Sequence, residues 1–359
     1  MKNGFKLMLV SHFFLLLIWL PINASSTEKY DPSLPRVVIV TTGGTVAMKY
    51  DPASGGVVPA LSGKDLIVAV PGLDKIANIE TVEFCNIDSS QMTPEIWRNL
   101  SSKVQKILER SDVQGVVVTH GTDTMAEGAF FLETTLQSEK PVVFVGAMRS
   151  ASDLSPDGPA NIYNSILQVC SPQAKGWGVT VTMNQFINSA RHVRKDQTTN
   201  VQTFTSGEHG YLGYIVDDQV IRFNNVLIKY KLPLPDLLPK VSFFTTYAGD
   251  DGKFIRYSVD HGAKGVVIEG VGAGNVNKDV FHAIKYALSK KVPVVVASRV
   301  RYGSVYALYG DEGGGSSLIN IGAYLAGDLS SYKARLLLMI ALAQPDMTPE
   351  KLKTLFSPQ

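Results

Sequence analysis

Threonine residues beside glycine occur at two places in the chain where a hydroxyl could act as a nucleophile. Thr45 follows Gly43 and Gly44, and Thr122 follows Gly121. A threonine hydroxyl attacks poorly unless a base accepts its proton. The glycines would let a substrate approach the backbone, whose N–H groups could stabilise a developing oxyanion. Taken alone, each motif is more often a tight turn with a capping threonine.

A lysine and an aspartate could complete such a group. Lys195 could act as a general base if burial favours its neutral form, although a run of mixed charges such as residues 191–196 is more often an exposed surface. Asp123 could cap the following helix or pair with the ammonium group of an amino acid. These residue types suit nucleophilic attack and amino-acid binding, but each alone is more often a turn, a cap or an exposed charge.

The two threonines also follow runs that are typical of buried parallel strands. Residues 36–40 read RVVIV and residues 116–118 read VVV, and all of these side chains except Arg36 are β-branched. In open α/β sheets, ligands bind at the carboxyl ends of such strands. We therefore expect both hydroxyls in one crevice.

Strand and helix patterns alternate along the chain, which predicts βαβ units and a mostly parallel sheet. Residues 62–65 resemble a capping box, Thr93-Pro94-Glu95 is a strong helix start, and residues 47–60 are expected to be a loop. Further strands are expected at 79–85, 141–145 and 178–183, helices at 94–110, 124–136 and 157–169, and a hairpin at 211–223.

The length of 359 residues suits two domains. Three prolines in residues 229–240 indicate a linker. The fold class is therefore α/β, with a larger N-terminal domain over residues 25–228 and a smaller α/β C-terminal domain over 241–359. In the second domain we expect strands at 241–247, 265–269 and 292–297, a glycine-rich loop at 302–317, an amphipathic helix at 330–342 and a last short helix from Thr348.

The first 24 residues have the pattern of a secretory signal peptide. Lys2 and Lys6 precede an apolar segment over residues 7–20, and Ala24 suits cleavage. The alternative is a membrane anchor or a buried helix, but the segment is short for a membrane span. We expect a periplasmic or secreted protein without membrane attachment after cleavage. Removal of the signal peptide leaves 32 basic and 32 acidic residues. The mature chain thus has no net charge, and no basic tract indicates nucleic-acid binding.

Cys85 and Cys170 are the two cysteines of the chain. Both lie in apolar segments, where two buried thiols are at least as plausible as a disulfide. The histidines and cysteines show no metal-ligand spacing, so we expect no metal site.

Five motifs together are far more specific than any one alone. The chain resembles the type II, exported, bacterial-type L-asparaginases from residue 34 to its end. This resemblance implies a cofactor-free amidohydrolase that converts L-asparagine and water to L-aspartate and ammonia. It also implies a homotetramer with active sites shared between subunits. The motifs are TGGTVA at 42–47, HGTDT at 120–124, VGAMR at 145–149, DGPANIYNS at 157–165 and GVGAGN at 270–275.

The resemblance also implies roles for particular residues. Thr45 matches the nucleophile, while Thr122, Lys195 and Asp123 match a second catalytic group. Ser89 and Asp123 match the groups that hold the α-carboxylate and α-ammonium of the substrate. The remaining matches are Ser90, which follows Ser89 and lies at the α-amino end of the substrate, Ala147, which forms a wall of the pocket, and Asn275, which a neighbouring subunit supplies.

Three positions depart from the family pattern. The family's lid tyrosine aligns near Gly56, and we hypothesise that Tyr50 replaces it because it is the sole tyrosine in that segment. Ser90 stands where glutamine is common. The neighbour's glutamate aligns near Gly310, beside Asp311 and Glu312, either of which could serve.

Two other functions remain open from the sequence. A glutaminase-asparaginase would use the same residues on a side chain one methylene longer, which is worth only about 1–3 kcal/mol of discrimination. A non-catalytic, exported amino-acid-binding protein would also suit a signal peptide and two α/β domains. The paired threonines and Lys195 argue against this second alternative, since binding alone needs no nucleophile.

Overall fold

The computed structural model describes residues 30–59, 62–226 and 230–357. The expected signal peptide at 1–24 and its cleavage site lie outside the described residues, as does the start of the expected linker. Among the helices in the described part of the chain, none is long and apolar enough to cross a membrane.

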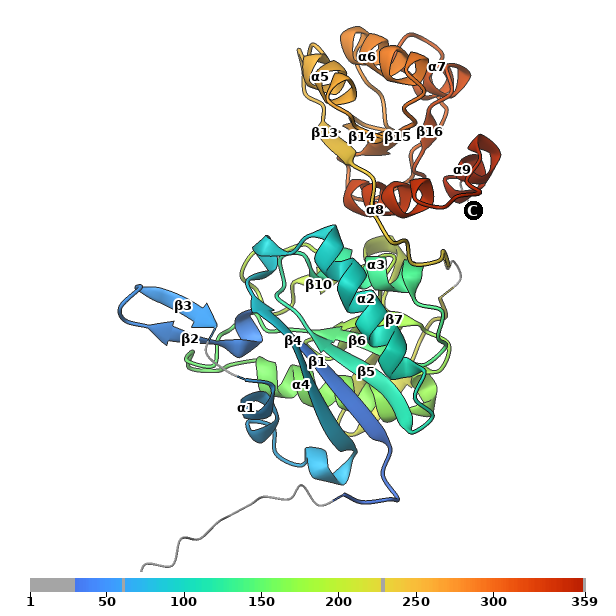
Figure 1. The fold of residues 1–359 in the computed structure, drawn as a ribbon. Helices are drawn as coiled ribbons and strands as arrows, with labels where there is room; N and C mark the ends of the chain where they lie inside the picture. The colour runs from blue at the N-terminus through green and yellow to red at the C-terminus, as the bar shows by residue number, and fades with distance from the viewer. Residues whose placement is uncertain (1–29, 60–61, 227–229, 358–359) are drawn as a thin grey trace, which may run out of the picture. The chain divides into compact units, whose positions relative to one another are not determined.

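An eight-stranded sheet forms the centre of the N-terminal half (Figure 1). Its order is β12-β11-β8-β7-β6-β5-β1-β4, with five parallel strands from β4 to β7 and antiparallel pairing beyond β7. The expected hairpin at 211–223 is confirmed as β11 and β12. The strands are β1 (Arg36–Gly43), β4 (Asn78–Ile87), β5 (Val113–Thr119), β6 (Val142–Val145), β7 (Val179–Met183), β8 (Phe186–Ser189), β11 (Gly213–Val216) and β12 (Gln219–Arg222).

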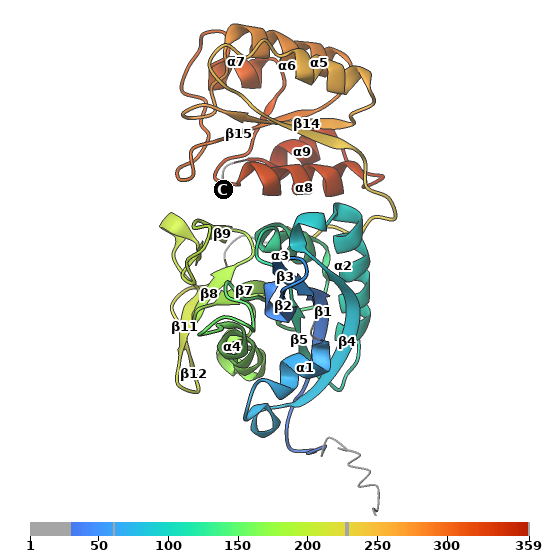
Figure 2. The same cartoon turned by 90° about the vertical axis from the view of Figure 1, so that its left-hand side faces the viewer.

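Helices cover both faces of this sheet. In Figure 2, α4 (Gly158–Cys170) lies on one side of the strands and α2 (Pro94–Leu108) on the other. α2 packs against α3 (Met125–Thr135), and α1 (Gly63–Val68) packs on β1 and β4. Both expected helix starts are confirmed, since Ser62 forms a capping box with Asp65 and the Thr93 side chain accepts the Ile96 N–H.

A second, four-stranded parallel sheet forms the core of the C-terminal half, in the order β13-β14-β15-β16. Helices α5 and α6 pack against each other, and α8 packs on β13, β14 and β15. The elements are β13 (Val241–Thr245), α5 (Lys253–Asp260), β14 (Gly265–Gly270), α6 (Lys278–Ser289), β15 (Val294–Ser298), α7 (Gly315–Asn320), β16 (Tyr324–Leu325), α8 (Ser331–Leu342) and α9 (Pro349–Leu355).

Short elements complete the description. Two small antiparallel ladders pair β2 (Met48–Asp51) with β3 (Gly56–Pro59) and β9 (Arg194–Lys195) with β10 (Phe204–Thr205). The 3-10 helices are Thr45–Ala47, Leu73–Lys75, Ser89–Gln91, Pro172–Ala174 and Gly207–His209. The predicted α/β class, with a larger and a smaller sheet flanked by helices, is confirmed.

Three local predictions were wrong. Residues 47–60 hold the β2–β3 hairpin instead of an irregular loop, because the turn between its strands lets them pair with each other. The expected loop at 302–317 is shorter than predicted, because its last residues form the first turn of α7. Helix α8 is not amphipathic, since it packs on the small sheet with one face and on α3 with the other, which buries nearly all of its side chains.

Candidate active site

The carboxyl ends of β1 and β5 place the two threonines together. The strands are parallel neighbours with Thr41 opposite Thr119, so both chains leave the sheet at the same edge. A Cβ on Gly44 would lie 2.4 Å from both N and Cα of Gly121, so these two glycines pack backbone to backbone. Thr45 and Thr122 directly follow these glycines, which explains why each motif needs glycine before its threonine.

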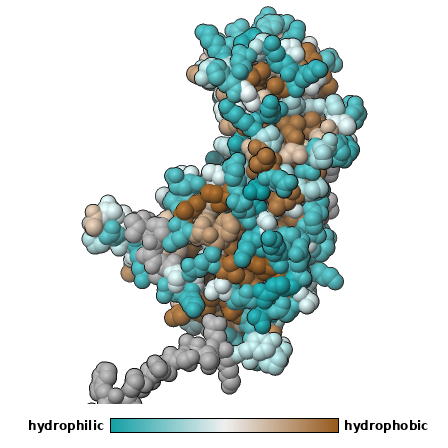
Figure 3. Space-filling view, in the orientation of Figure 1, coloured by the Kyte–Doolittle hydropathy of each residue, from teal (hydrophilic) through white to brown (hydrophobic). Residues whose placement is uncertain are grey.

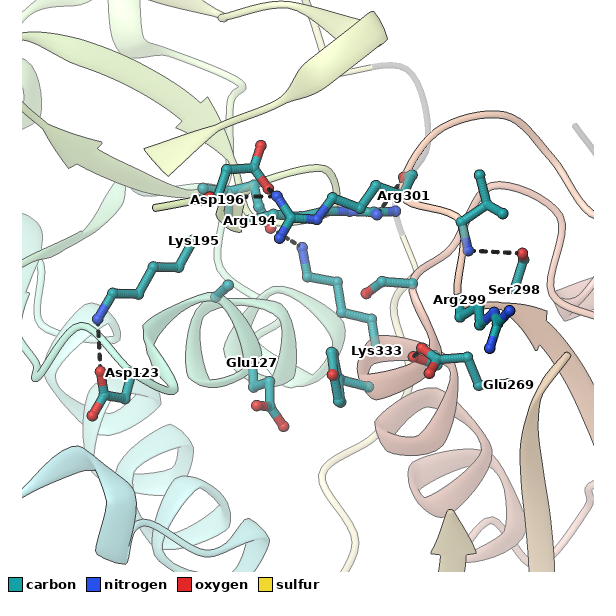
Figure 4. Close-up of a pocket in the computed structure, with 16 residues that line it drawn as sticks. Asp123, Glu127, Arg194, Lys195, Asp196, Glu269, Ser298, Arg299, Arg301 and Lys333 are labelled. Atoms are coloured by element: carbon teal, nitrogen blue, oxygen red, sulfur yellow. Dashed lines mark hydrogen bonds and ion pairs between the residues drawn. The ribbon is translucent and has the colours of Figure 1, made fainter. Parts of the chain in front are cut away.

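Lys195 connects the second threonine to the aspartate. Its Nζ donates a hydrogen bond to Thr122 Oγ1 at 3.0 Å and lies 2.6 Å from Asp123 Oδ1, as Figure 4 shows for the ion pair. Thr122 is buried, whereas the Asp123 side chain is 57% exposed. The pairing of β9 with β10 holds Lys195 in this position. The structure thus brings Thr122, Asp123 and Lys195 into direct contact.

Ser89 lies against the same segment. It is buried in the 3-10 helix that follows β4, and its Oγ accepts the Asp123 N–H at 3.2 Å. Its carbonyl accepts the Thr124 hydroxyl at 2.8 Å. A Cβ on Gly121 would lie 2.5 Å from Ser89 Oγ, so the serine packs directly on the glycine. Ser90, by contrast, is exposed, and its N–H bonds to Asp88 at 2.7 Å.

Two other predicted residues form no hydrogen bond with the side chains of this group within the described residues. Ala147 is buried after β6 with no polar role of its own. Asn275 lies in the turn after β14, where its backbone pairs with Val271, and no hydrogen bond joins it to Thr45 or Lys195 in the described chain. Its Oδ1 is buried without a hydrogen-bond partner in the described residues. Leaving a buried acceptor without a hydrogen bond costs about 1–3 kcal/mol of stability, so a donor from outside the described residues would stabilise this side chain.

A cavity of about 390 Å³ opens beside the Lys195–Asp123 pair (Figure 4). Charged side chains from both halves of the chain line this cavity, whereas Thr45 and Thr122 do not line it. Sequence reasoning missed most of this lining because it lies far from the motifs. The charged lining consists of Asp123, Glu127, Arg194, Lys195, Asp196, Glu269, Arg299, Arg301 and Lys333.

The three residues that could replace side chains missing from the family pattern lie at the surface. Tyr50, on β2, is 56% exposed, and its N–H donates to Ser152 Oγ at 2.9 Å. Asp311 and Glu312 are exposed as well. None of the three contacts the Thr122–Lys195 group through a hydrogen bond within the described residues.

A cluster of two histidines and an aspartate was not visible in the sequence. His192, His209 and Asp328 offer ligand atoms within 4.8 Å of one another, a donor set that a divalent metal could accept. The Arg191 guanidinium already occupies this place, with Nη1 at 2.8 Å from Asp328 Oδ2 and 2.7 Å from His192 Nε2. The imidazoles are stacked at 3.7 Å, so one metal cannot lie in both ring planes. The cluster is therefore an ion-pair network.

Both cysteines are free thiols. Burial raises the pKa of Cys170 to about 12 and raises the pKa of Cys85 as well. Neither group is therefore activated as a nucleophile, in agreement with the interpretation of two partly buried thiols.

Comparison with known protein families identifies the family to which the chain belongs. Residues 36–228 match the model of the asparaginase N-terminal domain, and residues 240–356 match that of the glutaminase/asparaginase C-terminal domain. The chain belongs to the asparaginase family. The prediction of a hydrolytic enzyme of this family is thereby confirmed.

Individual relatives agree over nearly the whole chain. L-asparaginase 2 of Bacillus subtilis is 36% identical, with 93% of this chain and 89% of the relative covered. A protein named probable periplasmic L-asparaginase, from Haemophilus influenzae, is 38% identical, with coverage of 87% and 89%. The crystal structure of a probable cytoplasmic L-asparaginase from Campylobacter jejuni is 40% identical and superposes with a TM-score of 0.81, over 90% of this chain and 100% of that one.

Proposed function

We propose that this enzyme hydrolyses L-asparagine to L-aspartate and ammonia, with Thr45 as the nucleophile. The observation that carries the proposal is the contact of Lys195 with both Thr122 Oγ1 and Asp123 Oδ1, directly beside the backbone junction that precedes Thr45. Relatives named L-asparaginase support the choice of substrate.

The reaction proceeds in two steps. Thr45 Oγ attacks the side-chain amide carbon, a C–O bond forms, the C–N bond breaks, and the hydroxyl proton leaves with the nitrogen as ammonia. Water then attacks the ester, the Thr45 C–O bond breaks and the hydroxyl is restored with release of L-aspartate. Thr122, with Lys195 and Asp123, moves protons in these steps. Backbone N–H groups of the glycine turns stabilise the oxyanion.

The substrate is a zwitterion, so both of its charged ends need partners once water is excluded. In this proposal Asp123 holds the α-ammonium group, since its carboxylate is more than half exposed and can reach a ligand. Ser89 binds the α-carboxylate. Asn275, whose Oδ1 lacks a donor, completes the site from a neighbouring subunit.

Ammonia release by the purified protein tests the proposal, with Thr45→Ala beside the unchanged enzyme. The matched control is Thr119→Val, three residues before Thr122, which removes a buried hydroxyl that has no hydrogen-bond partner among the described residues. We expect release from L-asparagine that Thr45→Ala abolishes and Thr119→Val retains. Full activity in folded Thr45→Ala would overturn the nucleophile, and tight binding without turnover would favour an amino-acid-binding protein.

L-Glutamine is the second candidate substrate, since the C-terminal family model is described as glutaminase/asparaginase. Ser90, which stands in place of the family's glutamine at the α-amino end of the substrate, is exposed, so the preference between the two amino acids could differ from that of the family. The ratio of kcat/KM for the two amino acids decides between the names. A ratio near one would mean a glutaminase-asparaginase.

Assembly and location belong to the same proposal. A homotetramer would cover large aromatic and apolar side chains that are exposed in the small domain. These side chains include Tyr247, Phe254, Tyr257, Tyr306, Leu308 and Tyr309. Figure 3 shows that hydrophobic residues also reach the surface on one face of the molecule. Export with cleavage after Ala24 is supported by the pattern of residues 1–24, while named relatives include both a periplasmic and a cytoplasmic protein. Light scattering and the N-terminal sequence of the purified protein test the two points.

A further inference from the structure

A fully buried histidine lies directly before the second catalytic motif. His120 is 0% exposed, and it immediately precedes Gly121 and Thr122. Its ring is enclosed by apolar neighbours, with the Phe144 ring centroid at 5.6 Å. Desolvation lowers the pKa of His120 to about 4, so the imidazole is neutral near pH 7. The reaction proposed above gives this side chain no role.

The partners of His120 determine which ring nitrogen carries the proton. Trp97 Nε1 lies 3.2 Å from His120 Nε2, and an indole N–H can only donate. Nε2 must therefore accept, and in a neutral imidazole the single proton lies on Nδ1. Nδ1 lies 2.7 Å from the carbonyl oxygen of Gly121, which can only accept. The ring thus donates a hydrogen bond to the peptide that links Gly121 to Thr122.

This peptide lies where three parts of the site meet. Gly121 packs against Gly44, which precedes Thr45, and against Ser89 Oγ. Thr122, at the other end of the peptide, accepts the hydrogen bond from Lys195. A rotation of the peptide would therefore shift Thr122 relative to Lys195 and press Gly121 into Gly44 or Ser89.

We propose that His120, oriented by Trp97, is a positioning residue that locks the Gly121–Thr122 peptide and thereby aligns Thr122 with Lys195 and the segments carrying Thr45 and Ser89. This inference rests on the proposed function of those groups. The lock acts through geometry, since a misplacement of about 1 Å in an active site can cost about 10²-fold in rate. Gly128 leaves the room that the pair needs, because a Cβ there would lie 2.8 Å from Trp97 Nε1.

Two substitutions separate the two hydrogen bonds of the ring. The amide nitrogen of asparagine matches Nδ1, so His120→Asn keeps a donor for the Gly121 carbonyl. The amide oxygen of glutamine matches Nε2, so His120→Gln keeps an acceptor for Trp97 and loses the donor to Gly121. We expect His120→Gln to lower kcat by about tenfold to a hundredfold with a smaller change in KM, and His120→Asn to restore much of that loss.

Trp97→Phe removes the donor that fixes the tautomer and should lower kcat severalfold. Trp177→Phe is the matched control, since Trp177 is also fully buried and its Nε1 donates to a backbone carbonyl, that of Asn224, away from the site. Equal kcat in the Asn and Gln variants, or equal losses in the two tryptophan variants, would reduce His120 to a packing residue and overturn the proposal.

Imidazole ¹⁵N NMR of the unchanged enzyme tests the lock without any variant or activity. We expect the His120 resonances of a neutral ring with its proton on Nδ1, assigned by their absence from His120→Asn or, if that variant does not fold, by their change in Trp97→Phe. A proton on Nε2 would overturn the proposal. If the enzyme released no ammonia but showed this tautomer, the proposed function would fail while the lock itself would stand.

Discussion

At the scale of single residues, Lys195 has the most consequential position in the proposed reaction. It contacts both Thr122 and Asp123, so the proposal uses both its charge and its proton. Arginine would keep the ion pair with Asp123 but cannot give up its proton in a protein. We expect Lys195→Arg to lower kcat by at least about 10²-fold in ammonia release, as loss of general base catalysis does. Lys231→Arg, at the ion pair with Glu133, is the control, and near-normal kcat in Lys195→Arg would refute the base.

Tyr50 is the second test at this scale. Its ring is 56% exposed on β2, so a role in catalysis requires the hairpin to bring it to substrate. If it replaces the family's lid tyrosine, Tyr50→Phe should lower kcat strongly, by about 10²-fold or more as for other proton-transfer groups. Tyr247→Phe removes a hydroxyl from a tyrosine of similar exposure, 58%, and serves as the control. An unchanged kcat in Tyr50→Phe would exclude the replacement.

The sequence names candidate residues for the site but not the contacts that support them. Thr45, Thr122 and Lys195 are candidates because glycine, strand ends and the family resemblance point to them, and their catalytic roles stay predictions. The contact of Lys195 with Thr122 could not be derived, since it depends on the β9–β10 pair, two strands of two residues each. The Trp97–His120 pair could not be derived either, because its partners are 23 residues apart on different elements.

At the scale of elements, the β2–β3 hairpin, like the β9–β10 pair, joins neither of the larger sheets among the described residues (Figure 1). Two hydrogen bonds join it to the turn after β6: Tyr50 N–H to Ser152 Oγ at 2.9 Å and Ala151 N–H to the Met48 carbonyl at 3.3 Å. Ser152→Ala removes the shorter bond, worth about 1 kcal/mol. We expect severalfold faster limited proteolysis within residues 48–59 and an unchanged melting temperature.

Ser289→Ala is the control for this loss, since Ser289 Oγ also bonds to one backbone group on the surface. Equal protease sensitivity of the two variants would mean that Ser152 does not hold the hairpin. If Tyr50 acts on the substrate, Ser152→Ala should also lower kcat a few-fold, and the two effects together would connect the hairpin to the site.

The elements themselves were predictable where a strong pattern decides them. Helix α2 has its cap, its proline and its apolar face in the sequence, and β5 has an uninterrupted β-branched run. Helix α8 was misjudged because it packs between two layers, and a sequence does not show the second layer. The β2–β3 hairpin was missed because glycine and proline in residues 52–59 are as common in loops as in hairpin turns.

At the scale of the whole chain, polar side chains link residues that are far apart in sequence. Arg191 forms two 2.8 Å hydrogen bonds with Asp328, 137 positions away. The buried Lys333, on α8, donates to the carbonyls of Arg191 and Val193 at 2.9 and 2.7 Å. Buried charges are tolerated only when they are paired and hydrogen-bonded, so loss of any one partner in this network would lower the stability of the fold. Single-sequence patterns gave no signal for it.

This network makes the folded chain sensitive to acid. Burial lowers the pKa of His192 and of His120 to about 4, from 6.5. His192 faces Asp328, which favours its cation, and Arg191 and His209, which oppose it. The unfolded chain therefore binds protons at both positions between pH 6.5 and 4, while the folded chain does not, so stability falls as pH falls through this window. The pKa of Asp328 is also lowered, so its ion pair weakens only below the ordinary carboxyl range.

The expected loss is about 2 kcal/mol for each histidine between pH 7 and 4.5, measured as the free energy of unfolding in urea. His192→Asn should remove roughly half of this pH dependence, because asparagine gains no proton in the unfolded chain. His282→Asn, at an exposed position on α6, should leave the dependence unchanged. If His192→Asn and the unchanged protein lost stability in parallel, His192 would have to be protonated in the fold. In that case the hydrogen bond from Arg191 to His192 could not persist, because a cationic imidazole has no lone pair to accept it.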